Sequence, residues 1–160
     1  MTTHTDEPKI ARSHTVSGWA LGEWADHILE QAGLGVTIVD LDGSVLFYNK
    51  WADARLDRKP EYLGQDVRDR HHRAVTNPRW NAMLQLFIDG RDEPVRYVAR
   101  PYGKMTILVT VSPIRVAGEL VGLSQIVQIR DEVEELFKRF DTSGRESFER
   151  EMLPNGFEEK

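Results

Sequence analysis

The pattern of apolar and polar positions is most regular in residues 35–49, GVTIVDLDGSVLFYN. Two short apolar runs containing Val, Ile and Tyr flank Asp42-Gly43, a dipeptide typical of tight hairpin turns. Asn49 ends the second run and precedes a helical run over residues 50–56, whose first-turn amides an asparagine side chain can cap. The segment therefore predicts a strand, a tight turn, a second strand and a capped helix.

Helical spacing of apolar residues predicts two further helices. Residues 19–32 carry apolar residues three to five positions apart and end at Gly33 and Gly35, which indicates an amphipathic leader helix. Residues 78–88 form a second candidate, with Thr76 or Asn77 as its cap and Pro78 at its first position. One face of this helix is apolar, and we expect it to look into the core; it carries Trp80, Met83, Leu84, Phe87 and Ile88.

Three strand-like segments follow, at residues 94–101, 104–115 and 120–130. They are separated by turn residues at positions 102–103 and 117–119. In residues 104–111 every second residue is apolar, which places Met105, Ile107, Val109 and Val111 on one face. With the first hairpin, these segments predict an α+β fold with five antiparallel strands.

This order of elements resembles the PAS domain, a sensory fold. The resemblance is carried by a strand, a D-x-x-G turn, a strand ending in Asn and a helix, and by the final segment QIRDEVEEL, which is similar to the PAS junction D-I-T-E. It implies a five-stranded antiparallel sheet with helices on one face and an N-terminal amphipathic leader helix. The expected organisation is a flexible arm at residues 1–17, a PAS domain with a signalling-type helix at 18–140, and a mobile acidic tail at 141–160.

Composition restricts the chemistry that this domain could carry. The chain has 160 residues, of which 40% are hydrophobic, so it can form one core. It has no cysteine, which excludes thiolate sites and is compatible with a reducing compartment. No apolar run is long enough for a membrane span or a signal peptide, so we expect a cytoplasmic protein. The net charge of −5 arises after residue 130. Acidic and basic residues are equal in number before that point, so residues 1–130 have no excess of positive charge that would indicate nucleic-acid binding.

A histidine pair, His71 and His72, marks the candidate functional site. Its surroundings resemble a PAS subgroup with the motif V-R-D-C-H-P-P-K-S and, more loosely, haem-binding PAS regulators; Val67-Arg68-Asp69 and His71 match, whereas Arg70 and residues 72–74 depart. The resemblance implies a b-type haem with His71, or alternatively His72, as the iron ligand. A haem also needs an apolar slot, whose wall would be formed by Trp80, Met83, Leu84 and Phe87. Asp66 or Asp69 could orient the other ring nitrogen.

The strands after the long helix offer candidates for the opposite side of a haem. Met105 could be the sixth ligand, whereas Tyr97 or Arg100 could hydrogen-bond a bound diatomic gas; Ile107 completes this set of cofactor-binding candidates. The alternatives are that the histidines lie on a charged surface loop and that Met105 is ordinary core packing. A non-haem metal is disfavoured because no HxH or HExxH spacing occurs.

Three functions remain open from the sequence. The first is a haem-based sensor of a diatomic gas or redox state that signals to a separate partner or through a homodimer, for which Trp19 and Trp24 could form a face. The second is a stand-alone haem-dependent enzyme that acts on a nitrogen- or oxygen-containing small molecule. The third is a haem-free PAS adaptor that binds an apolar metabolite or another protein.

Overall fold

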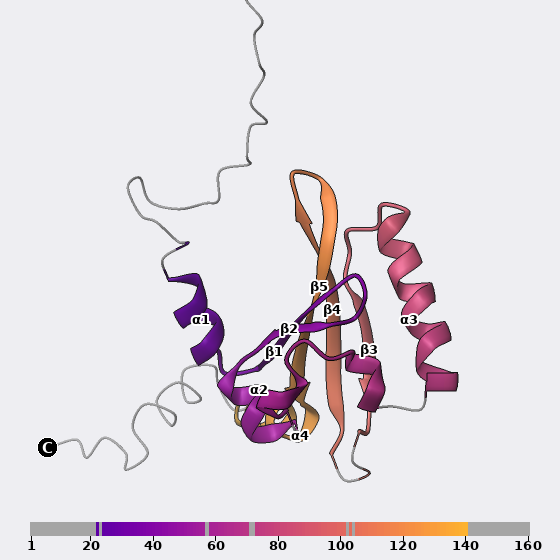
Figure 1. The fold of residues 1–160 in the computed structure, drawn as a ribbon. Helices are drawn as coiled ribbons and strands as arrows, with labels where there is room; N and C mark the ends of the chain where they lie inside the picture. The colour runs from indigo at the N-terminus through magenta and orange to yellow at the C-terminus, as the bar shows by residue number, and fades with distance from the viewer. Residues whose placement is uncertain are drawn as a thin grey trace, which may run out of the picture. The chain divides into compact units, whose positions relative to one another are not determined.

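The computed structural model of the protein describes residue 22 and residues 24–56, 58–70, 73–101, 103 and 105–140. Its strands form one five-stranded antiparallel sheet in the order β2-β1-β5-β4-β3 (Figure 1). The strands are β1 (Gly35–Asp40), β2 (Val45–Tyr48), β3 (Val95–Ala99), β4 (Ile107–Val116) and β5 (Glu119–Ile129). The helices are α1 (Ala25–Gln31), α2 (Lys50–Arg55), the 3-10 helices η2 (Pro60–Tyr62) and η3 (Val67–Arg70), α3 (Arg73–Ile88) and α4 (Arg130–Phe140). This is the predicted α+β fold.

The chain divides into two compact units, and each is described by itself. The first comprises Met1–Val95 and Thr110–Ile126, and the second comprises Arg96–Val109 and Val127–Lys160. The expected arm at residues 1–17 and the expected tail at 141–160 lie outside the described residues, as does Trp19. Within the part of the chain that is described, no helix combines the length and the apolar character needed to cross a membrane.

The predicted hairpin at residues 35–49 is confirmed. Strands β1 and β2 pair in antiparallel fashion, with a register shift between Ile38 and Val39. At the turn, the Asp40 carboxylate oxygen Oδ1 accepts hydrogen bonds from the backbone amides of Asp42 and Ser44, each at 2.9 Å. Gly43 has a φ of +87°, a left-handed conformation that glycine adopts without strain. The D-x-x-G turn is therefore held by its first aspartate and permitted by its glycine.

Asn49 follows β2 and caps α2, as the sequence predicts. Its side-chain Oδ1 accepts hydrogen bonds from the backbone amides of Ala52 in α2 and Val36 in β1, each at 3.1 Å. Its Nδ2 donates to the carbonyl oxygens of Leu29 in α1 and Leu34, each at 2.9 Å. The residue is fully buried and uses both donors and both acceptor positions of its amide. Asn49 therefore connects α1, β1 and α2.

Each unit has its own buried apolar residues. In the first unit they are Val36, Val39, Val45, Ala52, Leu56, Tyr62, Phe87, Val111 and Leu123, and in the second they are Ile107, Val109 and Val127. The burial of Ile107, Val109 and Val111 confirms the predicted alternation in β4. Strand β5 approaches β1 so closely at Gly122 that a Cβ atom there would lie 2.6 Å from the carbonyl oxygen of Val39. Glycine at position 122 therefore permits this strand contact.

Helix α3 ends at Ile88 as predicted but starts five residues earlier than predicted. It begins at Arg73, so Pro78 lies inside the helix and neither Thr76 nor Asn77 is its cap. Proline removes only the hydrogen bond that residue 78 would donate to residue 74, and contact with η3 supports the additional first turn. The expected core face is also only partly buried, because Ile88 is 56% exposed.

The remaining elements agree with prediction apart from their ends. Strand β3 excludes Pro94 and Pro101, and the leader helix is seen as α1 at Ala25–Gln31 within the wider predicted range. The predicted signalling-type helix is present as α4. Its first residue, Arg130, donates its backbone amide to the carbonyl oxygen of Thr106 at 2.9 Å and forms an ion pair with Glu134. The start of α4 is thus tied to the residues that lead into β4.

Candidate functional site

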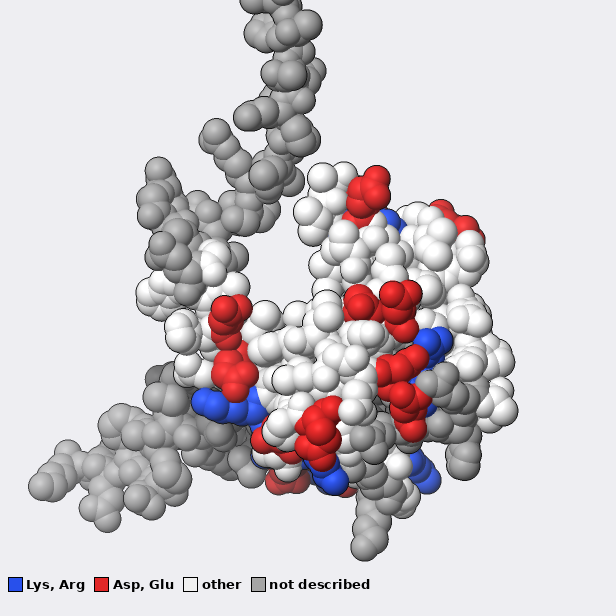
Figure 2. Space-filling view, in the orientation of Figure 1, with Lys and Arg blue, Asp and Glu red and all other residues white. Residues whose placement is uncertain are grey.

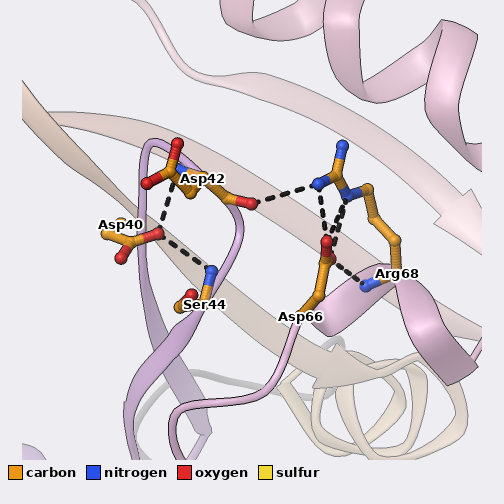
Figure 3. Close-up of polar contacts among 5 residues, drawn as sticks. All are labelled: Asp40, Asp42, Ser44, Asp66 and Arg68. Carbon is orange, nitrogen blue, oxygen red and sulfur yellow. Dashed lines mark hydrogen bonds and ion pairs between the residues drawn. The ribbon is translucent and has the colours of Figure 1, made fainter.

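The best-defined polar cluster of the described residues centres on Arg68 in η3 (Figure 3). Its Nε lies 2.9 and 3.1 Å from the two carboxylate oxygens of Asp66, and its Nη2 lies 2.6 Å from Asp66 Oδ2. The backbone amide of Arg68 also donates to Asp66 Oδ1 at 2.9 Å. These side chains are only 18% and 21% exposed. Hydrogen bonding to Asp66 raises the pKa of Arg68, so the guanidinium stays charged.

This cluster joins η3 to the turn between β1 and β2. Arg68 Nη2 donates to the carbonyl oxygen of Asp42 at 3.1 Å, and the amide of Val67 donates to the carbonyl oxygen of Gly43 at 2.9 Å. A Cβ atom at Gly43 would lie 3.1 Å from Asp66 Oδ1, so the turn glycine also makes room for the carboxylate. The D-x-x-G turn that carried the resemblance to the PAS fold therefore also forms hydrogen bonds with η3.

Arg68 also reaches the long helix. Its guanidinium carbon lies 5.5 Å from the centre of the Trp80 ring in α3, within range of a cation–π interaction. One side chain therefore contacts the hairpin turn, Asp66 just before η3, and α3. We name Asp42, Asp66, Arg68 and Trp80 the Arg68 cluster.

The histidines themselves lie outside the described residues. His71 and His72 follow η3 directly, so the Arg68 cluster fixes the chain immediately before them. Asp66, expected as an orienting partner for a histidine ring, has both carboxylate oxygens bonded to Arg68. The iron ligand stays a prediction. In the described segments, no group of three or more His, Cys, Asp or Glu side chains is arranged to hold a metal ion.

The four residues expected to form the slot wall on α3 differ in burial. Trp80, Met83 and Leu84 are half-buried, whereas Phe87 has no exposed surface. A side chain without accessible surface borders no space large enough for water, so Phe87 belongs to the core of its unit. Its carbonyl oxygen accepts a hydrogen bond from Arg115 Nη2 at 2.6 Å, and Arg115 Nε pairs with Asp92 Oδ1 at 2.9 Å. Strand β4 therefore holds the C-terminal end of α3.

The four strand candidates belong to the second unit, whereas α3 belongs to the first. Tyr97 is 44% exposed, Arg100 is exposed, Met105 is half-buried and Ile107 is buried. Their roles toward a cofactor stay predictions.

The sequence did not indicate a small depression beside the Arg68 cluster. It has a volume of about 10 Å³, enough for about one water molecule. Its lining residues are Val45, Arg58, Tyr62, Gln65, Asp66 and Val67. Arg58 Nη2 donates to Gln125 Oε1 at 3.3 Å, which ties this loop to β5. The depression is far too small for a haem. The ion pair between Asp66 and Arg68, which lies beside this depression, does have a local sequence signal, because the aspartate stands two residues before the arginine.

The charged side chains on one face of the molecule are dispersed. Figure 2 shows basic side chains scattered among acidic ones on the face in view, where the described residues form no continuous basic surface.

Known structures share this fold. A C-terminal domain from Streptococcus mutans is 24% identical, with a TM-score of 0.59, and the match covers 78% of this chain and 96% of that one. The PAS domain of a Colwellia psychrerythraea protein is 15% identical, with a TM-score of 0.56, and covers 69% and 97%. The PAS domain of Bordetella pertussis BvgS is also 15% identical, with a TM-score of 0.56, and covers 77% and 98%. At these identities the likeness concerns the fold alone.

The sequence itself identifies the family. No curated protein matches the chain. The family model for the PAS domain matches residues 25–128, from the start of α1 almost to the end of β5. That match concerns the PAS domain in general and lends no support to the narrower resemblance to its haem-binding members. The chain belongs to the PAS domain family.

Proposed function

We propose that this PAS domain is a sensory module that binds a small molecule beside η3 and α3 and passes the change to a separate partner or to a second copy. The Arg68 cluster is the observation that carries this proposal. Because Arg68 contacts the hairpin turn and Trp80 together, a shift of α3 alters contacts at the turn between β1 and β2. In this proposal the protein works in the cytoplasm.

We propose a b-type haem as the small molecule, with His71, or alternatively His72, as its iron ligand. The matching residues of the haem-type motif support this choice, as does the apolar surface of the half-buried side chains Trp80, Met83 and Leu84 on α3. Phe87 fits less well because it is fully buried. When bound, haem iron would supply a site for a diatomic gas or a redox change.

Titration of the purified protein with hemin tests the haem proposal. We expect a Soret band at one equivalent that is lost in His71→Ala and kept in His72→Ala. The reverse pattern would assign the iron to His72. If the parent protein gives no Soret band distinct from that of free hemin, with either ferric or ferrous iron, haem is not the ligand.

A haem-free ligand is the second candidate, favoured by the same apolar surface on α3. An apolar small molecule needs Trp80, Met83 and Leu84 but neither histidine. A screen of apolar metabolites by thermal shift tests this candidate. Stabilisation that survives in the double variant His71→Ala/His72→Ala but falls in Met83→Asp would support it. The absence of any such stabilisation would count against it.

A further inference from the structure

Helix α1 has little packing of its own. It spans seven residues, none of which is buried, and no side chain caps its N-terminus. Trp24 and Ile28, one turn apart, are 55% and 48% exposed. A helix this short is not stable alone in water. Its helical state therefore depends on contacts with the rest of the first unit.

Asn49 supplies such a contact at the C-terminal end of α1. The last carbonyl groups of a helix lack partners within the helix. One of them, Leu29 O, accepts a long bond of 3.4 Å from the backbone amide of Ala32 just after the helix and a bond of 2.9 Å from Asn49 Nδ2. Asn49 Nδ2 also donates to Leu34 O in the connection to β1 at 2.9 Å. Because Asn49 is fully buried, water does not replace these bonds while the side chain stays in place.

The two sides of the Asn49 amide serve different elements. Oδ1 accepts from Val36 and Ala52, which holds β1 and caps α2, whereas Nδ2 holds Leu29 and Leu34. Loss of the Nδ2 bonds therefore affects α1 without removing the cap of α2.

We propose that the side-chain NH2 group of Asn49 is the release point of α1. When its two hydrogen bonds are broken, α1 leaves the domain while the hairpin and α2 stay folded. This inference rests on the proposed sensory function for its use, because a helix that can be released is a means of signalling. Docking of α1 is itself measurable without any ligand.

The substitution Asn49→Asp tests the proposal. Aspartate keeps an acceptor oxygen for Val36 and Ala52 but turns a second oxygen, instead of a donor, toward two carbonyl groups. With two hydrogen bonds lost, we expect the equilibrium constant for docking of α1 to fall by about tenfold or more. Asn49→Ala is the matched control, because it also removes the cap and should loosen α2 as well.

Spin labels report the position of α1 directly. The chain has no cysteine, so cysteines at the exposed positions His27 in α1 and Ala54 in α2 would be the labelled sites. We expect a narrow distance distribution in the parent and a broad one in Asn49→Asp. A second pair, at Asp42 and Ala54, should stay narrow in both. An equally narrow α1–α2 distribution in Asn49→Asp would overturn the proposal.

Hydrogen exchange of the unsubstituted protein provides a test that needs no variant. Amides in α1 should exchange together, at least about tenfold faster than those in the interior of α2, because α1 opens without the rest of the unit. Equal protection of α1 and α2 would show that the two helices open as one and would refute the release point. Neither measurement involves hemin, so failure of the haem proposal leaves this result unaffected.

Discussion

The side chain of Thr37 in β1 yields a quantitative prediction. It is 1% exposed, and its hydroxyl Oγ1 is buried without a hydrogen-bond partner. A buried hydroxyl that lacks a partner costs about 1–3 kcal/mol relative to its hydrated state in the unfolded chain. Valine has almost the same shape and replaces the hydroxyl with a methyl group. We therefore expect Thr37→Val to raise the free energy of unfolding by about 1–2 kcal/mol.

Urea unfolding followed by tryptophan fluorescence measures this change. The midpoint should rise while the slope m stays constant, and Tm should rise by about 2–4 °C for each kcal/mol in a chain of this size. Thr37→Ser is the matched control: it keeps the hydroxyl, loses a buried methyl group and should be less stable by about 1 kcal/mol. If Thr37→Val is less stable than the parent, the hydroxyl has a partner in solution and the reasoning is refuted.

Three further substitutions test particular contacts through the free energy of unfolding. Gly122→Ala places a Cβ 2.6 Å from a β1 carbonyl and should cost about 1–3 kcal/mol, whereas Gly33→Ala, which meets nothing within 4 Å, should be nearly neutral; equal effects would contradict the strand contact. Ala117, with a φ of +52°, occupies a left-handed turn position, so Ala117→Gly should stabilise by about 1 kcal/mol, and a destabilised variant would show that the turn is not strained. Arg68→Met leaves the half-buried Asp66 carboxylate without its ion-pair partner and should cost about 1–3 kcal/mol. Adding Asp66→Asn should recover part of this loss. If the effects of the two substitutions simply add in the double-mutant cycle, Asp66 and Arg68 are not energetically coupled.

Local signals predicted the parts of the fold that depend on neighbouring residues. The turn at Asp42-Gly43 and the cap at Asn49 each involve groups within a few positions of one another, so composition and spacing were sufficient. The second role of Asn49 was missed because its Nδ2 partners, Leu29 and Leu34, lie 20 and 15 residues earlier in the chain. No periodic pattern encodes such a contact.

The candidate site was harder to predict for the same reason. Arg68 was noted as part of a motif, but its bond to Asp42 spans 26 residues and its contact with Trp80 depends on where α3 lies. The predicted start of α3 was wrong. The prediction placed Pro78 at the first position because proline favours that position, but the helix packs against η3 and begins five residues before Pro78. Tertiary contacts therefore decided the features that sequence reasoning missed.

The hydrogen bond between Arg115 and the carbonyl oxygen of Phe87 anchors the C-terminal end of α3 to β4. The helix has 16 residues and is about 24 Å long. If the anchored end stays in place, a tilt of about 5° moves the opposite end by about 2 Å. The opposite end follows His71 and His72 and contacts η3, so a tilt displaces this end most, while the Phe87 side chain hardly moves in its core.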